Sequence, residues 1–169
     1  MKEKFLTDHC LRYEFVIDAP VAKVWSLWST ESGLLSFFAP KVNVEFTIGG
    51  AFEILFNPEA EPGYRGAEGM MIMALEPEKL ISFTWNSPPT LPTVRNQMTA
   101  VHVYMQAEGQ ATKLLFIHSG FGYSEEWQKS KDYFHRAWGD IVLPKLKHAA
   151  EVGPITWEED MDVSPVAYL

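Results

Sequence analysis

The chain has 169 residues, which fits one domain with a short tail, and 14% of them are aromatic, more than a core of this size needs. Its 22 acidic and 14 basic residues give a net charge of −8, and no run of Lys or Arg reverses this charge locally, so nucleic acid is excluded as a partner. Cys10 is the single cysteine, so a disulfide within the chain is excluded. The sequence has no signal-peptide pattern and no apolar stretch of about 20 residues, which predicts a cytoplasmic protein without membrane insertion.

The first predicted element is a strand over residues 10–17, because apolar and polar side chains alternate along it. Pro20 then signals the start of a helix, whose apolar stripe includes Trp25 and Trp28. A short second helix follows and is stopped by Pro40. The chain therefore begins with one strand and two short helices.

Strand-like runs fill the middle of the chain, and they are separated by turn signals. The predicted strands are residues 42–46, 52–56, 70–76, 80–86, 99–108 and 112–120. The segments 57–69 and 87–97 are rich in Gly and Pro and are predicted to be loops. The last four strands are expected to form two hairpins.

A long helix is predicted from Ser124, a preferred N-cap residue, to about Ala150. Pro144 lies inside this helix and lacks the N–H that would bond to a carbonyl one turn earlier, which costs about 3 kcal/mol in a straight helix. We therefore predict a kink between Gly139 and Pro144.

One strand, two short helices, six strands and a long helix favour an α+β fold with an antiparallel sheet. The long amphipathic helix must cover one face of this sheet, and a curved sheet around such a helix leaves room for a cavity. We expect residues 1–150 to form one domain. Residues 151–169 are expected to be a C-terminal tail that packs on the domain or on a partner subunit.

Five segments in this order resemble the START-like (SRPBCC) superfamily, in the branch of the heat-shock-protein-90 ATPase activator homologues. They are "FVIDAPVAKVWSLWST", "FFAP", "IGGAFEI", "LISFTW" and the run from Thr112 to His118, followed by Trp138 in the late helix. The resemblance implies a helix-grip fold, in which a seven-stranded antiparallel sheet wraps around a C-terminal helix over a cavity. It also implies binding of a small apolar molecule, as in many relatives. This chain departs from the family pattern, because its helix carries Gly139 after Trp138 rather than before it and Pro144 beyond.

The walls of the predicted cavity are mostly aromatic. The candidate residues are Trp25, Trp28, Phe37, Phe38, Phe52, Ile54, Phe56, Phe83, Trp85, Arg95, Phe116, His118, Tyr133, Phe134 and Trp138. Plain packing in the core is the commoner role for any one of them, whereas the whole set is larger than a small core requires. Of Trp25 and Trp28, which lie three residues apart, only one is expected to face the cavity.

His118 is the titratable side chain that the strand pattern aims at the cavity. Because Lys113 must face outward, the alternation places Thr112, Phe116 and His118 inward. A buried histidine is either a proton shuttle or ligand contact, or it satisfies a hydrogen bond in the core. Arg95 borders the expected entrance, where it either pairs with a ligand carboxylate or is solvated.

Spacings typical of metal or cofactor sites are missing, since the histidines are not spaced as ligands and no phosphate-binding loop or nucleophile elbow occurs. We predict no metal and no cofactor.

The first hypothesis is a module that binds a small apolar or amphipathic ligand. The second is a cyclase- or hydrolase-like enzyme that uses His118, with Arg95 or Tyr133 orienting the substrate. The third is a chaperone co-factor-like module that binds protein through an exposed face. Tyr104, Leu115 and Ile117 form an apolar outer face, which leaves a homodimer open.

Overall fold

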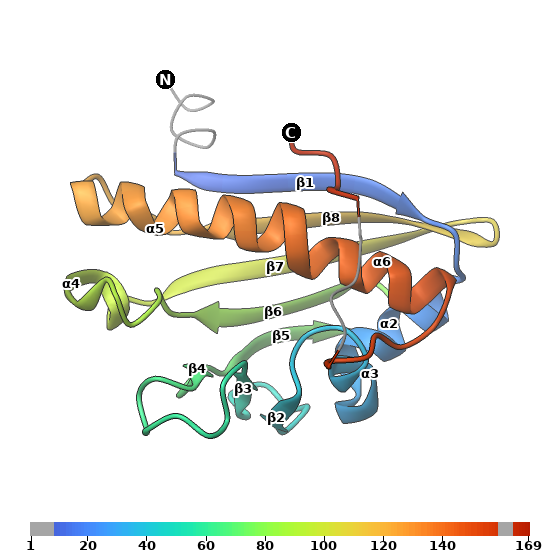
Figure 1. Ribbon diagram of the computed structural model, residues 1–169. Helices are drawn as coiled ribbons and strands as arrows, with labels where there is room; N and C mark the ends of the chain where they lie inside the picture. The colour runs from blue at the N-terminus through green and yellow to red at the C-terminus, as the bar shows by residue number, and fades with distance from the viewer. Residues whose placement is uncertain (1–8, 159–163) are drawn as a thin grey trace.

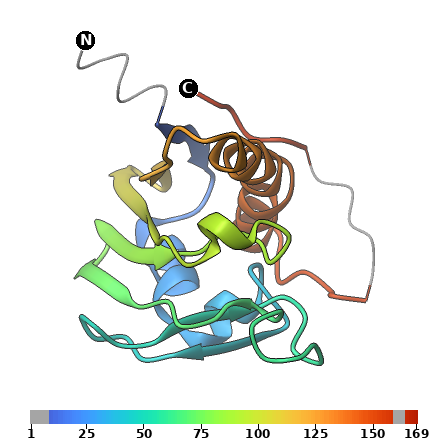
Figure 2. The ribbon, with the colours of Figure 1, turned by 90° about the vertical axis from the view of Figure 1, so that its left-hand side faces the viewer.

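The computed structural model describes residues 9–158 and 164–169 (Figure 1). These residues form two antiparallel sheets, one with the strand order β1-β8-β7-β6-β5 and one with the order β2-β3-β4. The strands are β1 (Cys10–Ile17), β2 (Lys41–Val44), β3 (Phe52–Leu55), β4 (Gly66–Ala67), β5 (Ile72–Glu76), β6 (Leu80–Trp85), β7 (Thr99–Glu108) and β8 (Ala111–Ser119). Figure 2 shows the strands curving around the long helix, which is seen end-on. The predicted α+β class is confirmed.

The prediction of a single seven-stranded sheet is wrong. In the described parts of the chain, the two sheets meet at an isolated bridge between Ala51 and Met71 and at a few backbone hydrogen bonds around it, such as that from the Ile72 N–H to the Gly50 carbonyl. The pairing of β5 with β6 shifts register between Ile72 and Ala74, and such a bulge bends a strand and increases its twist. Between the two sheets, the described residues form this isolated contact rather than a continuous pairing of strands. The extra strand, β4, lies in a segment predicted to be loop.

The long helix consists of three consecutive segments, α5 (Glu125–Arg136), the π-helical η1 (Ala137–Val142) and α6 (Leu143–Glu151). The predicted start is confirmed, because the Ser124 hydroxyl accepts a hydrogen bond from the Trp127 N–H at 3.2 Å. Glu125 and Glu126 in the first turn face the positive end of the helix dipole. The helix ends near the predicted residue.

The disturbance predicted before Pro144 takes the form of a change in hydrogen-bond register. The Leu143 N–H donates to the carbonyl of Trp138, five residues earlier, as in a π-helix. Pro144 has no N–H, so the next bond of this register cannot form. The segment that this disturbs, η1, is the one that carries Trp138.

Gly139 lies against the Tyr13 side chain of β1. A Cβ at this position would lie 2.9 Å from the Tyr13 ring, so only glycine lets η1 approach β1 this closely. Tyr13 is buried, and its hydroxyl donates to the His135 carbonyl at 2.8 Å. The glycine thus allows the helix and the first strand to pack in contact.

Two short helices, α2 (Val21–Ser29) and α3 (Glu31–Leu35), lie at one end of the large sheet. Trp28 in α2 is fully buried there among the rings of Phe37, Phe38 and Phe83. Both helices are present as predicted, but α3 ends at Leu35, before Pro40, which was expected to stop it. The segment predicted as a proline-rich loop contains a short helix, α4 (Pro92–Arg95), which begins with a proline at a position that helices tolerate.

The chain after α6 returns along the molecule. The Ile155 N–H donates to the Ser36 carbonyl, and the Trp157 indole N–H donates to the Leu35 carbonyl, both at 2.9 Å. Residues 164–169 then lie beside β1, next to the long helix (Figure 1).

Candidate functional site: a pocket under the long helix

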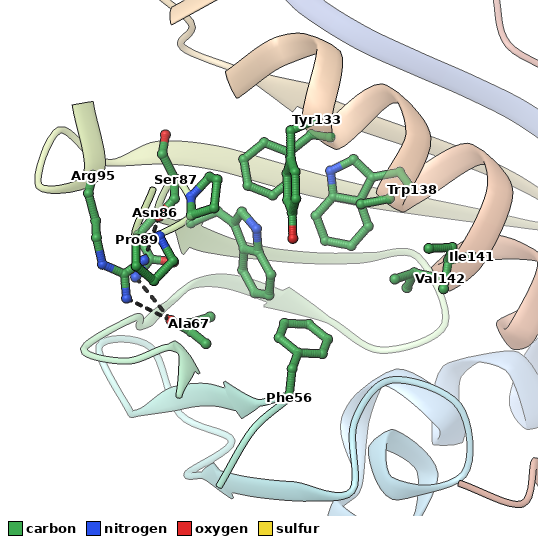
Figure 3. A pocket seen from close by; sticks show the side chains of 15 residues that line it. Phe56, Ala67, Asn86, Ser87, Pro89, Arg95, Tyr133, Trp138, Ile141 and Val142 are labelled. Atoms are coloured by element: carbon green, nitrogen blue, oxygen red, sulfur yellow. Dashed lines mark hydrogen bonds between the residues drawn. The ribbon is translucent and has the colours of Figure 1, made fainter. Parts of the chain in front are cut away.

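A pocket of about 280 Å³ lies between the long helix and the ends of strands from both sheets (Figure 3). It is lined by Phe56, Gly66, Ala67, Trp85, Asn86, Ser87, Pro88, Pro89, Arg95, Tyr133, Phe134, Ala137, Trp138, Ile141 and Val142. Its volume is near the lower end of the range for small-molecule sites. The long helix forms one wall, and the loops around α4 and β4 form the other.

The two ends of the pocket differ in chemistry. Arg95 and Asn86 lie at one end, and Ile141 and Val142 lie at the other (Figure 3). Tyr133 projects from α5 into the space between these ends (Figure 3). The pocket can therefore hold an apolar body and offers hydrogen-bond donors at one end.

Arg95 is held in place by backbone carbonyl groups. Its guanidinium donates to the carbonyls of Ser87 at 2.5 Å, Gly63 at 2.7 Å and Gly66 at 3.2 Å, and a carboxylate oxygen of Glu68 lies 3.9 Å away. Its side chain is only 14% exposed. Arg95 thus ties the α4 segment to the loop before β4 and forms part of the pocket wall.

A chain of hydrogen bonds connects the two tryptophans that line the pocket. The Trp138 indole N–H donates to His118 Nδ1 at 3.0 Å, and His118 Nε2 lies 2.7 Å from the Thr99 hydroxyl, which donates to the Trp85 carbonyl at 3.1 Å. An indole nitrogen can only donate, so His118 Nδ1 accepts and its Nε2–H donates to Thr99. This network assigns the neutral tautomer of His118.

His118 lies behind the pocket wall. It is fully buried, as the strand pattern predicted, but it is not among the lining residues, because the Trp138 indole lies between. Burial, and secondarily the charge of His102, lower the pKa of His118 from 6.5 to about 3. Both ring nitrogens are engaged within the protein, so the geometry gives His118 a structural hydrogen-bonding role and no direct contact with a molecule in the pocket.

The structure brings six of the fifteen candidate residues to the pocket: Phe56, Trp85, Arg95, Tyr133, Phe134 and Trp138. Eight others are buried in the core away from it: Trp28, Phe37, Phe38, Phe52, Ile54, Phe83, Phe116 and His118. Trp25 is half-buried and packs at the edge of the core. Neither Trp25 nor Trp28 lines the pocket, although one of them was expected to do so.

The pocket residues that sequence reasoning missed are mostly small or belong to loops, such as Gly66, Ala67, Asn86 and Pro89. No periodic pattern marks such residues. Ile141 and Val142 carry a detectable signal, since they lie on the apolar face of the long helix one turn after Trp138.

Within 9–158 and 164–169, no group of three His, Cys, Asp or Glu side chains is placed to hold a metal ion. In the same residues, no helix is both long enough and apolar enough to cross a membrane.

An antiparallel sheet that curves around a long C-terminal helix, with a pocket between them, defines a START-like protein. The chain belongs to the activator of Hsp90 ATPase homolog 1-like family, whose profile matches residues 18–151. Both statements agree with the resemblance seen in the sequence. A comparison with curated proteins finds no significant match.

Solved structures share the fold at low sequence identity. Protein MLL2253 from Mesorhizobium loti is 19% identical, with a TM-score of 0.66 over 82% of this chain and 94% of that one. The Aha1 dimer from Colwellia psychrerythraea is 17% identical, with a TM-score of 0.62 over 85% and 97%. CalU16 from Micromonospora echinospora is 21% identical, with a TM-score of 0.62 over 88% and 78%. At these identities the comparison establishes the fold alone.

Proposed function

We propose that this protein binds a small apolar or amphipathic molecule in the pocket under the long helix. The observation that carries this proposal is the pocket's composition, a mostly aromatic and aliphatic wall with a few polar groups gathered at one end. Ligand sites in proteins commonly have this composition, because apolar walls supply affinity and a few polar groups orient the ligand.

The expected ligand has an apolar body with a hydrogen-bond acceptor at one end. The body would lie between Phe56 and the helix residues Trp138 and Ile141. The acceptor would face Arg95 and Asn86. Arg95 is already engaged with three carbonyls, so we assign it chiefly to shaping this end of the pocket.

Binding is favoured over catalysis by the titratable groups on the wall. Of the described residues that line the pocket, only Arg95 and Tyr133 carry ionisable side chains. General acid–base catalysis uses His, Asp, Glu, Lys, Cys or Tyr within reach of the substrate, and of these residue types only Tyr133 is among the described lining residues. The enzyme hypothesis loses its main candidate because His118 lies behind Trp138.

Filling the pocket is expected to weaken binding. Ala137→Leu adds a larger side chain to the wall, so the dissociation constant of the neutral fluorescent probe N-phenyl-1-naphthylamine should rise at least about tenfold, a change of 1.4 kcal/mol. Arg136→Leu introduces the same side chain at the preceding, exposed position and serves as the matched control. Native mass spectrometry of the purified protein, followed by extraction, would identify a molecule that is already bound. Failure of the wild type to bind the probe, or equal weakening by both variants, contradicts the proposal.

Self-association is the second candidate, and it is supported by the outer face of the large sheet. Tyr104 and Val16 are 41% and 48% exposed there, and an open groove of about 770 Å³ includes Leu115 and the ion pair between Glu14 and Lys113. A surface with apolar groups and both charges can pair with a copy of itself. The related Aha1 structure from Colwellia psychrerythraea is a dimer.

If the outer face forms a homodimer, Tyr104→Glu should shift the mass measured by light scattering from dimer toward monomer, because it buries an unpaired charge in the interface. Probe binding in the pocket should stay unchanged. A wild type that stays monomeric at high concentration excludes this second candidate.

A further inference from the structure

The carbonyl of Gly139 lacks a donor within its own helix. In the π-helical register its donor would be residue 144, but Pro144 has no N–H. In the α-helical register its donor would be Leu143, whose N–H is bonded to Trp138 instead. Gly139 is buried, and a buried carbonyl without a partner costs about 1–3 kcal/mol.

The missing donor comes from the C-terminal end of the chain. The Val166 N–H donates to the Gly139 carbonyl at 3.1 Å, and the Val166 side chain packs against the core. The Leu169 N–H donates to the Arg12 carbonyl in β1 at 2.8 Å. Residues 164–169 therefore contact both η1 and the free edge of the large sheet.

Tyr168 adds side-chain contacts to this docking. Its backbone forms an isolated antiparallel β-bridge with Tyr13 in β1. Its ring lies edge-on to the rings of Tyr13 and His135, with centroid distances of 5.2 and 4.7 Å. His135 is near the end of α5, immediately before η1. The C-terminal residues thus contact β1, the end of α5 and η1.

We infer that residues 164–169 are a strap that positions the pocket wall, and that Pro144 is what makes the strap necessary. The wall residues Trp138, Ile141 and Val142 all lie in η1, the segment whose open carbonyl the strap satisfies. Val166 and Pro144 are positioning residues that act through this backbone. The consequence for a ligand rests on the proposed binding function, whereas the effect on η1 does not.

Amide hydrogen exchange of the full chain, measured by NMR, tests the strap without a ligand. Val166→Pro removes the N–H, and Val166→Ala keeps the N–H but shortens the side chain. We expect the amides of η1 and of Leu143 to exchange about tenfold faster in V166P than in V166A, as expected for one lost buried hydrogen bond. The amides of β8 serve as an internal reference and should not change.

Rescue by a second substitution separates this inference from a general structural role. Pro144→Ala restores an N–H that can reach the Gly139 carbonyl in the π-helical register, so the difference between V166P and V166A should fall below about twofold in that background. Three results would overturn the inference. They are equal exchange in V166P and V166A, faster exchange that extends to β8, and an undiminished difference in the P144A background.

The outcome for the pocket is read separately with N-phenyl-1-naphthylamine. Weaker probe binding by V166P than by V166A supports the positioning of the wall by the strap. If the wild type does not bind the probe while the exchange results hold, the proposed function fails and the strap stands. Protection of η1 that depends on protein concentration, together with a dimer mass, would contradict a strap acting within one chain.

Discussion

Between about pH 7.5 and pH 5, the free energy of unfolding is expected to fall by about 2 kcal/mol through His118 alone. The pKa of this side chain is lowered from 6.5 to about 3 in the folded protein, chiefly by burial. Below pH 6.5 the unfolded chain takes up a proton that the folded protein does not, so stability falls as the pH falls. The loss should approach about 1.4 kcal/mol per pH unit and level off near pH 3.

The measurement is urea unfolding at a series of pH values, for the wild type and for His118→Gln. The variant lacks the titrating group, so its stability at neutral pH will be lower but its loss between pH 7.5 and pH 5 should be smaller by about 2 kcal/mol. His102→Gln is the control, since burial also lowers the pKa of His102 but this residue is only half-buried. Parallel curves for the wild type and H118Q would show that His118 is not held neutral by the fold.

Trp138→Phe is expected to destabilise the protein by about 3 kcal/mol, and Trp28→Phe by about half as much. Both indoles are buried, and both substitutions remove the same atoms. The Trp138 N–H is bonded to His118 Nδ1, which its loss would leave as a buried acceptor without a partner. The Trp28 N–H is buried and has no hydrogen-bond partner among residues 9–158 and 164–169, so its removal relieves a cost.

Urea unfolding at pH 7.5 compares the two variants. Because their volume changes match, the difference in their free energies of unfolding reports mainly on the hydrogen bond to His118. Trp138→Phe should also change probe binding, since Trp138 lines the pocket and Trp28 does not. A cost for Trp28→Phe equal to or above that for Trp138→Phe would contradict the assigned network.

Local patterns in the sequence predicted most of the elements. Ser124 marked the start of the long helix, and Pro144 marked the region of its irregularity. The alternation around Lys113 correctly placed Phe116 and His118 on the buried side of β8. These predictions succeeded because caps, proline geometry and strand alternation act over only a few residues.

The candidate site was predicted less well, for a physical reason. Strand or helix periodicity tells which face of an element is buried, but not what lies against that face. Phe52 and Phe83 have the same pattern as the pocket residues Phe56 and Trp85, yet they stack on each other in the core with ring centroids 4.2 Å apart. Only the crossing of the long helix over the sheet decides which rings border open space.

The sequence by itself determined the α+β class, the start of the long helix, the family and the inward direction of His118. The tertiary structure decided the break between the two sheets, the burial of His118 behind Trp138 and the contact between Val166 and Gly139. Each of these depends on residues far apart in the chain. Among the described residues, the two sheets are linked by the contact around Ala51 and Met71, and the packing of helix on sheet places the indole of Trp138 over His118. Such contacts are set by the packing of whole elements, which short-range patterns do not encode.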